Sequence, residues 1–301
     1  MNEWVPVLKA SGLEIRENVP LSTCTTMGVG GPARWILSPT CRRNAETMMS
    51  ALTRHKIPWM VLGKGANTIF SDEGFPGAII RLKGLLEKFR FQGNSVVAGG
   101  GVILHRMVCS AVERGLGGLE RLAGFPSTVG GAVMMNAGCY GQSIEAAFDH
   151  AILITPEGAS RTLLRSEAGF EYRTSSFSER GIIAYTVFQF GAQPVSTLRA
   201  SMEEVLARRK ESLPPGRHAG SVFKNPPGHK AWELIRACGL AGLREGMAEI
   251  STVHSNVILN RGSASATDIF TLARRMISEV RDRFGVVLEP EVKFIGFPPL
   301  V

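Results

Sequence analysis

Glycine clusters are the feature that most constrains this chain. The sequence of 301 residues contains 34 glycines, and many of them stand in groups between residues 28 and 141. Glycine lacks a Cβ atom, so such groups are typical of tight turns and of backbone that closely approaches another group. With 44% hydrophobic and 20% charged residues, the chain can also form a sizeable core. We therefore expect a folded protein of about two domains with functional glycine-rich loops.

Short apolar runs alternate with helical patterns along the chain. Five segments have the apolar spacing of amphipathic helices: Arg42–His55, Ile103–Arg114, Thr197–Glu211, Lys230–Cys238 and Ala266–Phe284. Shorter runs are expected to form strands: Trp35–Leu37, Trp59–Leu62, Ala78–Arg81, Val96–Ala98, Ala151–Ile154, Ile182–Phe190, Val257–Leu259 and Val292–Ile295. The mixture predicts an α+β fold. Ser212–Gly228 is rich in proline, glycine and serine, which is typical of a domain junction that carries a functional loop.

Charge and cysteine usage narrow the class of protein. The net charge is +8, but the basic residues are scattered and the nearest approach to a run is Arg208–Lys210. This pattern suits anionic small molecules at least as well as nucleic acid. The five cysteines lack metal-ligand or redox spacing, and no stretch approaches the roughly 20 apolar residues of a membrane span. The charged N-terminus does not resemble a signal peptide. We expect a cytoplasmic protein with no metal, membrane or nucleic-acid partner.

The first candidate site is a loop with two glycines after the apolar run Trp59–Leu62. Gly63 and Gly65 allow backbone N–H groups to converge on one point, which suits a pyrophosphate, and Lys64 adds positive charge. The loop lacks the third glycine of the dinucleotide-binding fingerprint and the spacing of a phosphate-binding P-loop. On residue types alone, a plain structural turn is the more frequent meaning of such a loop.

The second candidate segment, Ala123–Gly138, consists mostly of small residues. Such a stretch can lie flat against a planar cofactor because few side chains stand in the way. Ser127, Thr128 and Asn136 supply its few polar side-chain atoms. A close-packed helix and turn explains the same composition equally well.

Three further segments contain residues of reactive type. Arg173 could hold a carboxylate or phosphate bidentately, although a surface arginine is the commoner case. Ser221 lies in a proline-rich loop, where it could act as an acid, as a nucleophile or only as a turn residue. No Gly-x-Ser-x-Gly motif surrounds it, which disfavours acyl transfer. Glu289 and Glu291 flank Pro290, and one of them could be buried and functional or both could lie on an exposed edge strand.

The order of these segments closely resembles that of one known family. The matching segments are Pro20–Ala33, Leu62–Asn67, Ser71–Gly77, Gly118–Gly138, Tyr172–Phe177, Gly220–Pro226 and Leu288–Gly296. From about Asn18 to Gly296, the chain resembles the UDP-N-acetylenolpyruvoylglucosamine reductase (MurB) family in its compact subtype.

The resemblance implies an α+β fold with an FAD-binding part of the vanillyl-alcohol-oxidase (PCMH) type. The FAD-binding domain would comprise residues 1–196, in two subdomains at about 18–84 and 85–196, and residues 197–301 would form a substrate-binding domain. The implied cofactor is non-covalent FAD, with NADPH as the reductant. The implied reaction reduces UDP-N-acetylglucosamine enolpyruvate to UDP-N-acetylmuramate in peptidoglycan precursor synthesis, and we expect a monomer.

The resemblance also assigns roles to individual residues. Arg173, Ser221 and Glu291 match the catalytic arginine, the proton donor and the catalytic glutamate of the family. Positions near the substrate are matched by Tyr172, Lys224 and Asn225. The cofactor-binding positions are Gly63, Lys64, Gly65, Ala66, Asn67, Ser127, Thr128, Gly130, Gly131, Ala132, Asn136, Ala137 and Gly138.

Several positions depart from the usual family pattern. This chain has Met27-Gly28 where the family usually has an aromatic residue and an arginine, and Lys64 and Ala66 where it usually has glycine and serine. Phe125 and Ser127 replace the usual isoleucine and glycine. His254-Ser255-Asn256-Val257 replaces the usual His-Ala-Asn-Phe. These departures affect expected FAD contacts and leave the three catalytic positions intact.

Two alternatives to this interpretation remain. One is another FAD-dependent oxidoreductase or oxidase of the same superfamily, against which Gly220–Pro226 and Leu288–Phe294 argue. The other is a non-enzymatic basic binding protein, which would bind DNA in a salt-sensitive manner.

Overall fold

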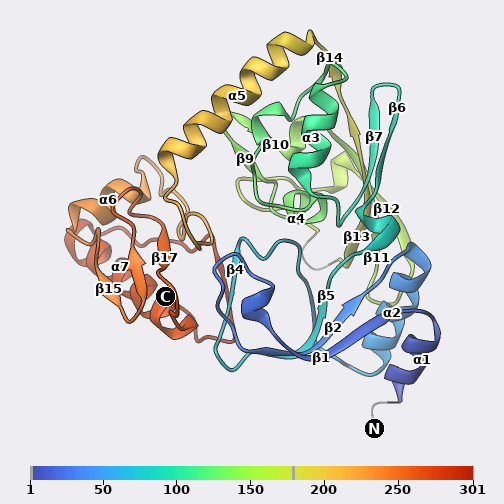
Figure 1. The fold of residues 1–301 in the computed structure, drawn as a ribbon, viewed down its shortest axis with the longest axis horizontal. Helices are drawn as coiled ribbons and strands as arrows, with labels where there is room; N and C mark the ends of the chain where they lie inside the picture. Colours follow the sequence, from blue (N-terminus) through green and yellow to red (C-terminus); the bar gives the residue numbers. More distant parts are fainter. Residues whose placement is uncertain (1–2, 178–179, 301) are drawn as a thin grey trace. The chain divides into compact units, whose positions relative to one another are not determined.

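The computed structural model describes residues 3–177 and 180–300, and the chain divides into two compact units (Figure 1). The first unit comprises Met1–Glu17, Trp35–Gly63 and Gly77–Arg208, and the second comprises Asn18–Arg34, Lys64–Pro76 and Arg209–Val301. Both units mix helices with strands, which confirms the predicted α+β fold. Among the described helices, none is long and apolar enough to cross a membrane.

The first unit contains a five-stranded antiparallel sheet in the order β12-β11-β13-β7-β6. The strands are β6 (Phe89–Gln92), β7 (Ser95–Gly99), β11 (Phe148–Ile154), β12 (Ser160–Leu164) and β13 (Ile182–Gln189). Val96 and Ala98 of β7 are buried in a core that also contains Met107 and Val108 of α3 (Leu104–Val112). Because alternate residues of a strand face opposite sides of a sheet, these two residues lie on the same face of β7.

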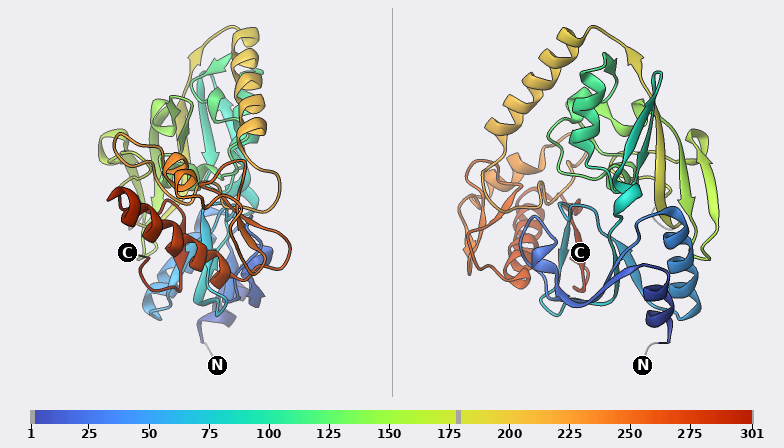
Figure 2. Two further views of the ribbon diagram at one scale, coloured as in Figure 1. Left: turned by 90° about the vertical axis from the view of Figure 1, so that its left-hand side faces the viewer. Right: turned by 45° about the vertical axis from the view of Figure 1, so that its right-hand side comes forward.

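A second core of the first unit forms around α1 (Trp4–Ala10) and α2 (Arg42–Arg54), which lie side by side (Figure 2). Trp4 and Trp35 make an edge-to-face contact with their ring centroids 5.0 Å apart, a favoured geometry for aromatic pairs. A four-stranded sheet runs in the order β1 (Glu14–Pro20), β2 (Pro32–Ser38), β5 (Phe75–Ile80) and β3 (Trp59–Val61).

The second unit contains a three-stranded antiparallel sheet and a separate parallel strand pair. The sheet consists of β15 (Arg244–Glu245), β16 (Ala248–Ile250) and β17 (Ile258–Asn260). The parallel pair joins β4 (Thr68–Phe70) to β18 (Lys293–Ile295), with Lys293 opposite Thr68. This pairing brings the residues after the first glycine loop next to the C-terminal segment, which follows them by more than 200 positions in the sequence.

Helix α7 (Ala266–Phe284) organises the core of the second unit. Its buried residues follow the helical period: Ala266, Ile269, Phe270, Leu272, Ala273, Met276, Ile277 and Val280. The helix begins with a capping box between Ser265 and Asp268 and ends at Gly285, whose φ of 68° is left-handed. Asp72 also accepts hydrogen bonds from Ala266 N at 2.8 Å and from Thr267 N at 3.0 Å. Burial raises the pKa of Asp72. The two backbone hydrogen bonds and a third from the Thr267 hydroxyl lower the pKa by more, so that it lies below the usual value of an aspartate.

The predicted helices are all present in the structure. They are α2, α3, α5 (Val195–Ser212), α6 (Ala231–Ala237) and α7, and only their ends differ by a few residues in places. Missing from the prediction were α1, α4 (Val129–Met134) and several short strands. The remaining short elements are β8 (Leu116–Gly117), β9 (Gly138–Cys139), β10 (Gln142–Ser143), β14 (Gly191–Ala192), and the 3₁₀ turns η1 (Leu21–Thr23), η2 (Gly84–Glu87), η3 (Glu120–Leu122), η4 (Ile144–Ala146) and η5 (Arg165–Glu167).

Candidate functional site

The second glycine-rich segment forms helix α4 and the turn that follows it. Thr128 caps the helix, and its Oγ1 accepts a hydrogen bond from Gly131 N at 3.3 Å. Gly130 N donates to Gly100 O at 2.8 Å, and a Cβ on Gly130 would stand 3.0 Å from that oxygen. Glycine at position 130 therefore allows the start of α4 to approach the Gly100 backbone closely.

The start of α4 presents backbone that is almost free of side chains. Gly131 is exposed, and a Cβ built on it would meet only Ser127 Oγ at 3.1 Å and Thr128 Oγ1 at 3.3 Å. Gly63 of the first loop also lies close to Thr128. A Cβ built on Gly63 would stand 2.5 Å from Thr128 Oγ1. The exposed backbone of Gly131, with few side chains around it, suits a flat or anionic cofactor, so these residues fit the FAD predicted for them.

Other residues predicted to contact the cofactor serve the packing of this segment. Ala132 and Ala137 are buried in the core of the first unit. Asn136 has a left-handed φ of 38° and is also buried. Its side chain donates to Glu171 O at 3.2 Å and accepts from Glu145 N at 3.2 Å. Asn136 thus connects the segment after α4 to two other parts of the chain.

Arg173 lies in a loop that is attached to the end of this segment. Its Nη1 donates to Gly138 O at 2.6 Å, and Ser175 Oγ donates to Met134 O at 2.7 Å. The φ of Arg173 is 60°, in the left-handed region that residues with a Cβ seldom adopt. Such strain persists only where the surroundings impose it, and it is frequent at functional sites. Tyr172 is 59% exposed, and its ring centroid lies 5.5 Å from the Arg173 guanidinium carbon.

The rest of the first glycine loop belongs to the second unit. Gly65 has a φ of 63°, and a Cβ there would stand 2.4 Å from Cys24 O. Its own carbonyl accepts a hydrogen bond from Thr26 N at 3.1 Å. Lys64 is exposed, while Ala66 and Asn67 are half-buried. Glycine at position 65 is thus required by both the backbone conformation and the close contact with Cys24.

Ser221 and Glu291 lie on neighbouring segments of the second unit. Glu291 N donates to Val222 O at 2.8 Å, and Val222 N donates to Asn256 O at 2.8 Å. Asn256 is buried and makes two more hydrogen bonds with the backbone of Phe223, which fixes this segment. The structure thus brings two of the three predicted catalytic residues together although 69 residues of chain separate them.

The predicted substrate residues Lys224 and Asn225 follow directly. Lys224 Nζ lies 2.5 Å from Glu289 Oε1, and its backbone N donates to Glu289 O at 2.9 Å. The carboxamide of Asn225 accepts a hydrogen bond from Ala231 N at the start of α6, at 3.0 Å. The sequence left open whether one of the two glutamates is buried or both are exposed. In the structure, Glu289 is exposed and paired with Lys224, and Glu291 is half-buried.

His218 is a residue near this site that sequence reasoning missed. Its Nδ1 accepts a hydrogen bond from Gly220 N at 3.0 Å, and its carbonyl accepts one from Thr26 Oγ1 at 2.7 Å. Burial lowers the pKa of His218, and the positive charge of Arg209 lowers it further. The ring is therefore neutral at neutral pH and helps to fix the turn before Ser221. A lone histidine in a loop gives no sequence signal for this role.

At Met27-Gly28, where the chain departs from the family pattern, another residue lies beside the changed position. Met27 is completely buried, and the Gly28 that follows it has a φ of 70°. A Cβ on Gly28 would stand 3.1 Å from Cδ and 3.2 Å from Nη1 of Arg217. An arginine from the domain-junction segment thus lies beside the position where the family usually carries its own arginine.

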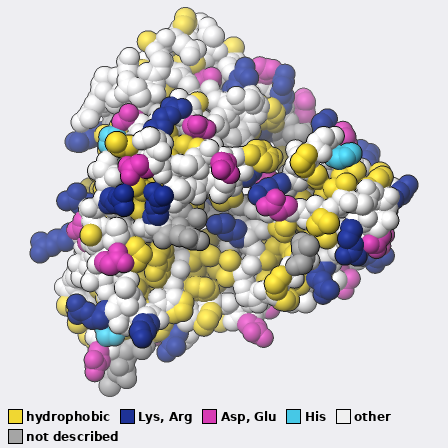
Figure 3. Space-filling view, turned by 180° about the vertical axis from the view of Figure 1, so that it is seen from behind, with side chains coloured by type: hydrophobic (Ala, Val, Ile, Leu, Met, Phe, Trp, Pro, Cys, Tyr) yellow, Lys and Arg dark blue, Asp and Glu magenta, His cyan; other side chains and the backbone are white. Residues whose placement is uncertain are grey.

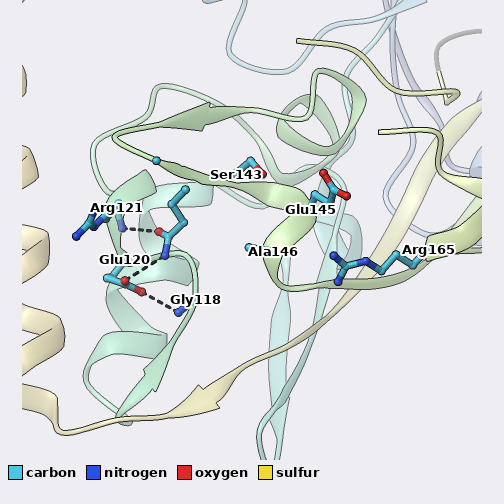
Figure 4. Close-up of a pocket in the computed structure, with 9 residues that line it drawn as sticks. Gly118, Glu120, Arg121, Ser143, Glu145, Ala146 and Arg165 are labelled. Carbon is cyan, nitrogen blue, oxygen red and sulfur yellow. Dashed lines mark hydrogen bonds between the residues drawn. The ribbon is translucent and has the colours of Figure 1, made fainter. Parts of the chain in front are cut away.

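A polar pocket of about 520 Å³ lies elsewhere in the first unit (Figure 4). Glu120 accepts hydrogen bonds there from Gly118 N and from the Gln142 side chain, and Arg165 and Glu145 project from its other side. The lining residues are Gly118, Glu120, Arg121, Gly141, Gln142, Ser143, Glu145, Ala146 and Arg165, and they differ from every residue predicted for the site.

The basic side chains are dispersed on the face of the molecule drawn in Figure 3, with acidic and apolar side chains between them. A nucleic-acid footprint is typically a continuous basic patch or stripe. This face therefore gives no support to the alternative of a basic binding protein.

Comparisons with known proteins agree over nearly the whole chain. The family model for an FAD binding domain matches residues 33–163, and the model for the C-terminal domain of UDP-N-acetylenolpyruvoylglucosamine reductase matches residues 212–295. The UDP-N-acetylenolpyruvoylglucosamine reductase of Syntrophotalea carbinolica is 41% identical over 92% of this chain and 93% of its own length. UDP-N-acetylenolpyruvoylglucosamine reductase 2 of Symbiobacterium thermophilum is 38% identical over 95% of this chain and 94% of its own length.

A solved structure leads to the same conclusion. The crystal structure of UDP-N-acetylenolpyruvylglucosamine reductase (MurB) from Thermus caldophilus superposes with a TM-score of 0.81. It is 36% identical in sequence and covers 94% of this chain and 98% of that chain. The predicted resemblance is confirmed, and the chain belongs to the UDP-N-acetylenolpyruvoylglucosamine reductase (MurB) family.

Proposed function

We propose that this protein uses FAD and NADPH to reduce UDP-N-acetylglucosamine enolpyruvate to UDP-N-acetylmuramate, a step of peptidoglycan precursor synthesis. Membership in the family supports the proposal. The observation that carries it is the placement of Ser221 and Glu291 on hydrogen-bonded neighbouring segments. A hydroxyl that donates a proton and a carboxyl group that stabilises charge must act on the same substrate, and the neighbouring segments bring their two positions close together.

FAD would be held by the two glycine-rich segments. We assign FAD binding to Gly63–Asn67 and to Ser127–Gly138. Within the second segment, Ala132 and Ala137 would contact FAD through their backbone, because their side chains are buried. The exposed backbone at Gly131 offers a flat surface, and Lys64 offers a positive charge for the pyrophosphate. When bound, FAD would supply the redox chemistry, namely hydride transfer between NADPH and the terminal carbon of the enolpyruvyl group.

The protein side chains would stabilise charge and deliver the proton. Hydride addition leaves negative charge delocalised into the substrate carboxylate. Arg173 would supply the opposing positive charge, and Glu291, in its protonated form, would donate a hydrogen bond to the same group. Ser221 would then donate its hydroxyl proton to the neighbouring carbon, which completes the reduction.

The remaining assignments concern the substrate and the setting. We propose that Tyr172, Lys224 and Asn225 contact the UDP-sugar, and that residues 1–196 bind FAD while residues 197–301 bind substrate. The ammonium of Lys224 is ion-paired with the exposed Glu289, and an anionic group of the substrate would share or replace this partner. We further propose a monomeric cytoplasmic enzyme whose product supports cell shape and division.

One experiment with the purified protein tests this function. The visible spectrum is recorded first, NADPH is then added without oxygen, and UDP-N-acetylglucosamine enolpyruvate follows. We expect a yellow protein that bleaches with NADPH and recovers its colour with the substrate. Recovery with oxygen alone would instead indicate an oxidase of the same superfamily. A colourless protein that takes up no FAD would contradict the assignment of both glycine-rich segments.

A further inference from the structure

The main chain of Glu291 is fixed from two sides within the second unit. On one side, Glu291 N donates to Val222 O at 2.8 Å, next to Ser221. On the other side, the side-chain amide of Asn67 donates to Glu291 O at 3.1 Å. Pro290 precedes Glu291 and has a fixed φ, so the segment enters this position with little freedom.

The hydrogen bond from Asn67 extends the parallel pairing of β4 with β18. The Asn67 carbonyl accepts a hydrogen bond from Lys293 N at 3.1 Å, directly before the first paired residues, Thr68 and Lys293. The side chain of the same residue then donates to Glu291 O, two residues before the first paired residue of β18. Asn67 therefore determines where the chain lies just before β18, which is the position of Glu291.

We propose that Asn67 is a positioning residue for Glu291, in addition to any contact that it makes with FAD. The inference rests on the proposed function, because it matters only if Glu291 assists the reduction of substrate. It links the first glycine loop to the catalytic glutamate through a single carboxamide. Since a displacement of about 1 Å can reduce a rate by about 10²-fold, loss of this hydrogen bond should slow the substrate step without slowing the reduction of flavin.

Two variants separate this role from a role in FAD binding. Asn67→Ser shortens the side chain, and Asn67→Asp keeps its shape while replacing the donor with an acceptor that faces a carbonyl. For each holoenzyme, the FAD content, the rate of flavin reduction by NADPH and the rate of reoxidation by substrate are measured by anaerobic stopped-flow absorbance. With each variant saturated with FAD, we expect flavin reduction within about threefold of wild type and reoxidation slower by about 10- to 100-fold.

A matched control and a double variant make the test specific. Asn260 is another buried asparagine of the second unit, and its side chain donates to Met27 O at 2.9 Å, away from Glu291. Asn260→Ser should lower thermal stability and leave the ratio of the two rates unchanged. In a Glu291→Gln background, Asn67→Ser should add less than about threefold, because it acts through Glu291.

Three results would overturn the inference: loss of FAD in both Asn67 variants, equal slowing of both rates, or additive effects in the double variant. The first two would make Asn67 a cofactor ligand only and would leave the proposed function standing. A wild-type protein that NADPH reduces but that substrate does not reoxidise would overturn the proposed function, and this inference with it.

Discussion

The Arg173 loop and the segments of Ser221 and Glu291 differ in how much of their attachment depends on main-chain hydrogen bonds. In the first unit, the side chains of Asn136, Arg173 and Ser175 bond to backbone carbonyls of partner segments. In the second unit, Glu291 and Val222 are joined directly through main-chain groups, and the side chains of Asn67 and Asn256 add further hydrogen bonds. Main-chain hydrogen bonds survive most substitutions, whereas side-chain hydrogen bonds are lost with the side chain.

This difference determines what a substitution can reveal. A change at Ser221 should remove one reactive group and leave its surroundings in place. A change at Arg173 should affect both the charge that we propose it offers to the substrate and the loop that it helps to hold. The following predictions test this contrast, beginning with the largest effect.

Ser221→Ala should have the largest effect on turnover. We expect reoxidation by substrate to slow by about 10²-fold or more, because a general acid is lost. FAD content and reduction by NADPH should stay at wild-type values, because the segment is held by its main chain and by Asn256. Stopped-flow absorbance measures both rates. Unchanged turnover would show that Ser221 is not the proton donor.

Arg173→Lys should reduce kcat/KM for the substrate by about 10- to 100-fold, the scale of a lost hydrogen bond to a charged group. Lysine keeps the positive charge but lacks the planar fork that pairs with a carboxylate and with Gly138 O. Steady-state kinetics with varied substrate measure the effect. Arg165→Lys, in the separate pocket, is the matched control and should be nearly silent. An unchanged kcat/KM in Arg173→Lys would mean that the charge alone matters, and similar losses in the two variants would mean that the effect is not specific to position 173.

Asp72→Asn should destabilise the second unit by roughly 0.5–2 kcal/mol at neutral pH, the range for helix caps. Asp72 bonds to two backbone N–H groups at the start of α7, and its pKa is lower in the folded protein than in the unfolded chain. Its contribution is thus complete above the unfolded pKa of about 3.9 and is lost as pH falls through the lower folded value.

Urea unfolding followed by circular dichroism measures this effect. The gap between wild type and Asp72→Asn should be widest near pH 7 and should narrow toward pH 3. A gap that stays constant over this range would show that the carboxylate charge contributes nothing.

Ser175→Ala should give the smallest effect. The Met134 carbonyl loses its hydrogen bond from the buried Ser175 hydroxyl, which is worth about 0.5–1.5 kcal/mol. We expect thermal denaturation at a slightly lower temperature and a loss of kcat/KM below about tenfold, because Arg173 and Asn136 still hold the loop. A loss as large as that of Arg173→Lys would show that Ser175, rather than Arg173 itself, fixes the loop.

Local patterns predicted a large part of the fold. The bounds of α7 followed from its apolar stripe, and the first glycine loop was expected after a strand that in fact ends at Val61. α1 and α4 were missed for physical reasons. α1 is short and contains Pro6 in its first turn, where proline is tolerated. α4 contains two glycines, which are poor helix formers, and tertiary contacts stabilise it instead.

The site was predicted as a set of residues, and its connections were not. The hydrogen bond between Asn67 and Glu291 joins positions 224 residues apart, and no local period carries such information. His218 was missed for the same reason, because its role depends on burial and on Thr26 from a distant segment. The exposed ion pair of Lys224 with Glu289 likewise depends on the pairing of two distant segments.

The interleaving of the two units has a consequence for synthesis on the ribosome. Asn18–Arg34 and Lys64–Pro76 are made early, but the rest of their unit begins at Arg209. At about 5–20 residues per second, these segments wait on the order of ten seconds or more before their partners are made. Glycine-rich, partly apolar segments would meanwhile be open to chaperones and to aggregation. Truncation after Arg208 should therefore leave insoluble protein rather than a folded FAD-binding fragment, because Asn18–Arg34 and Lys64–Pro76 would lack the rest of their unit.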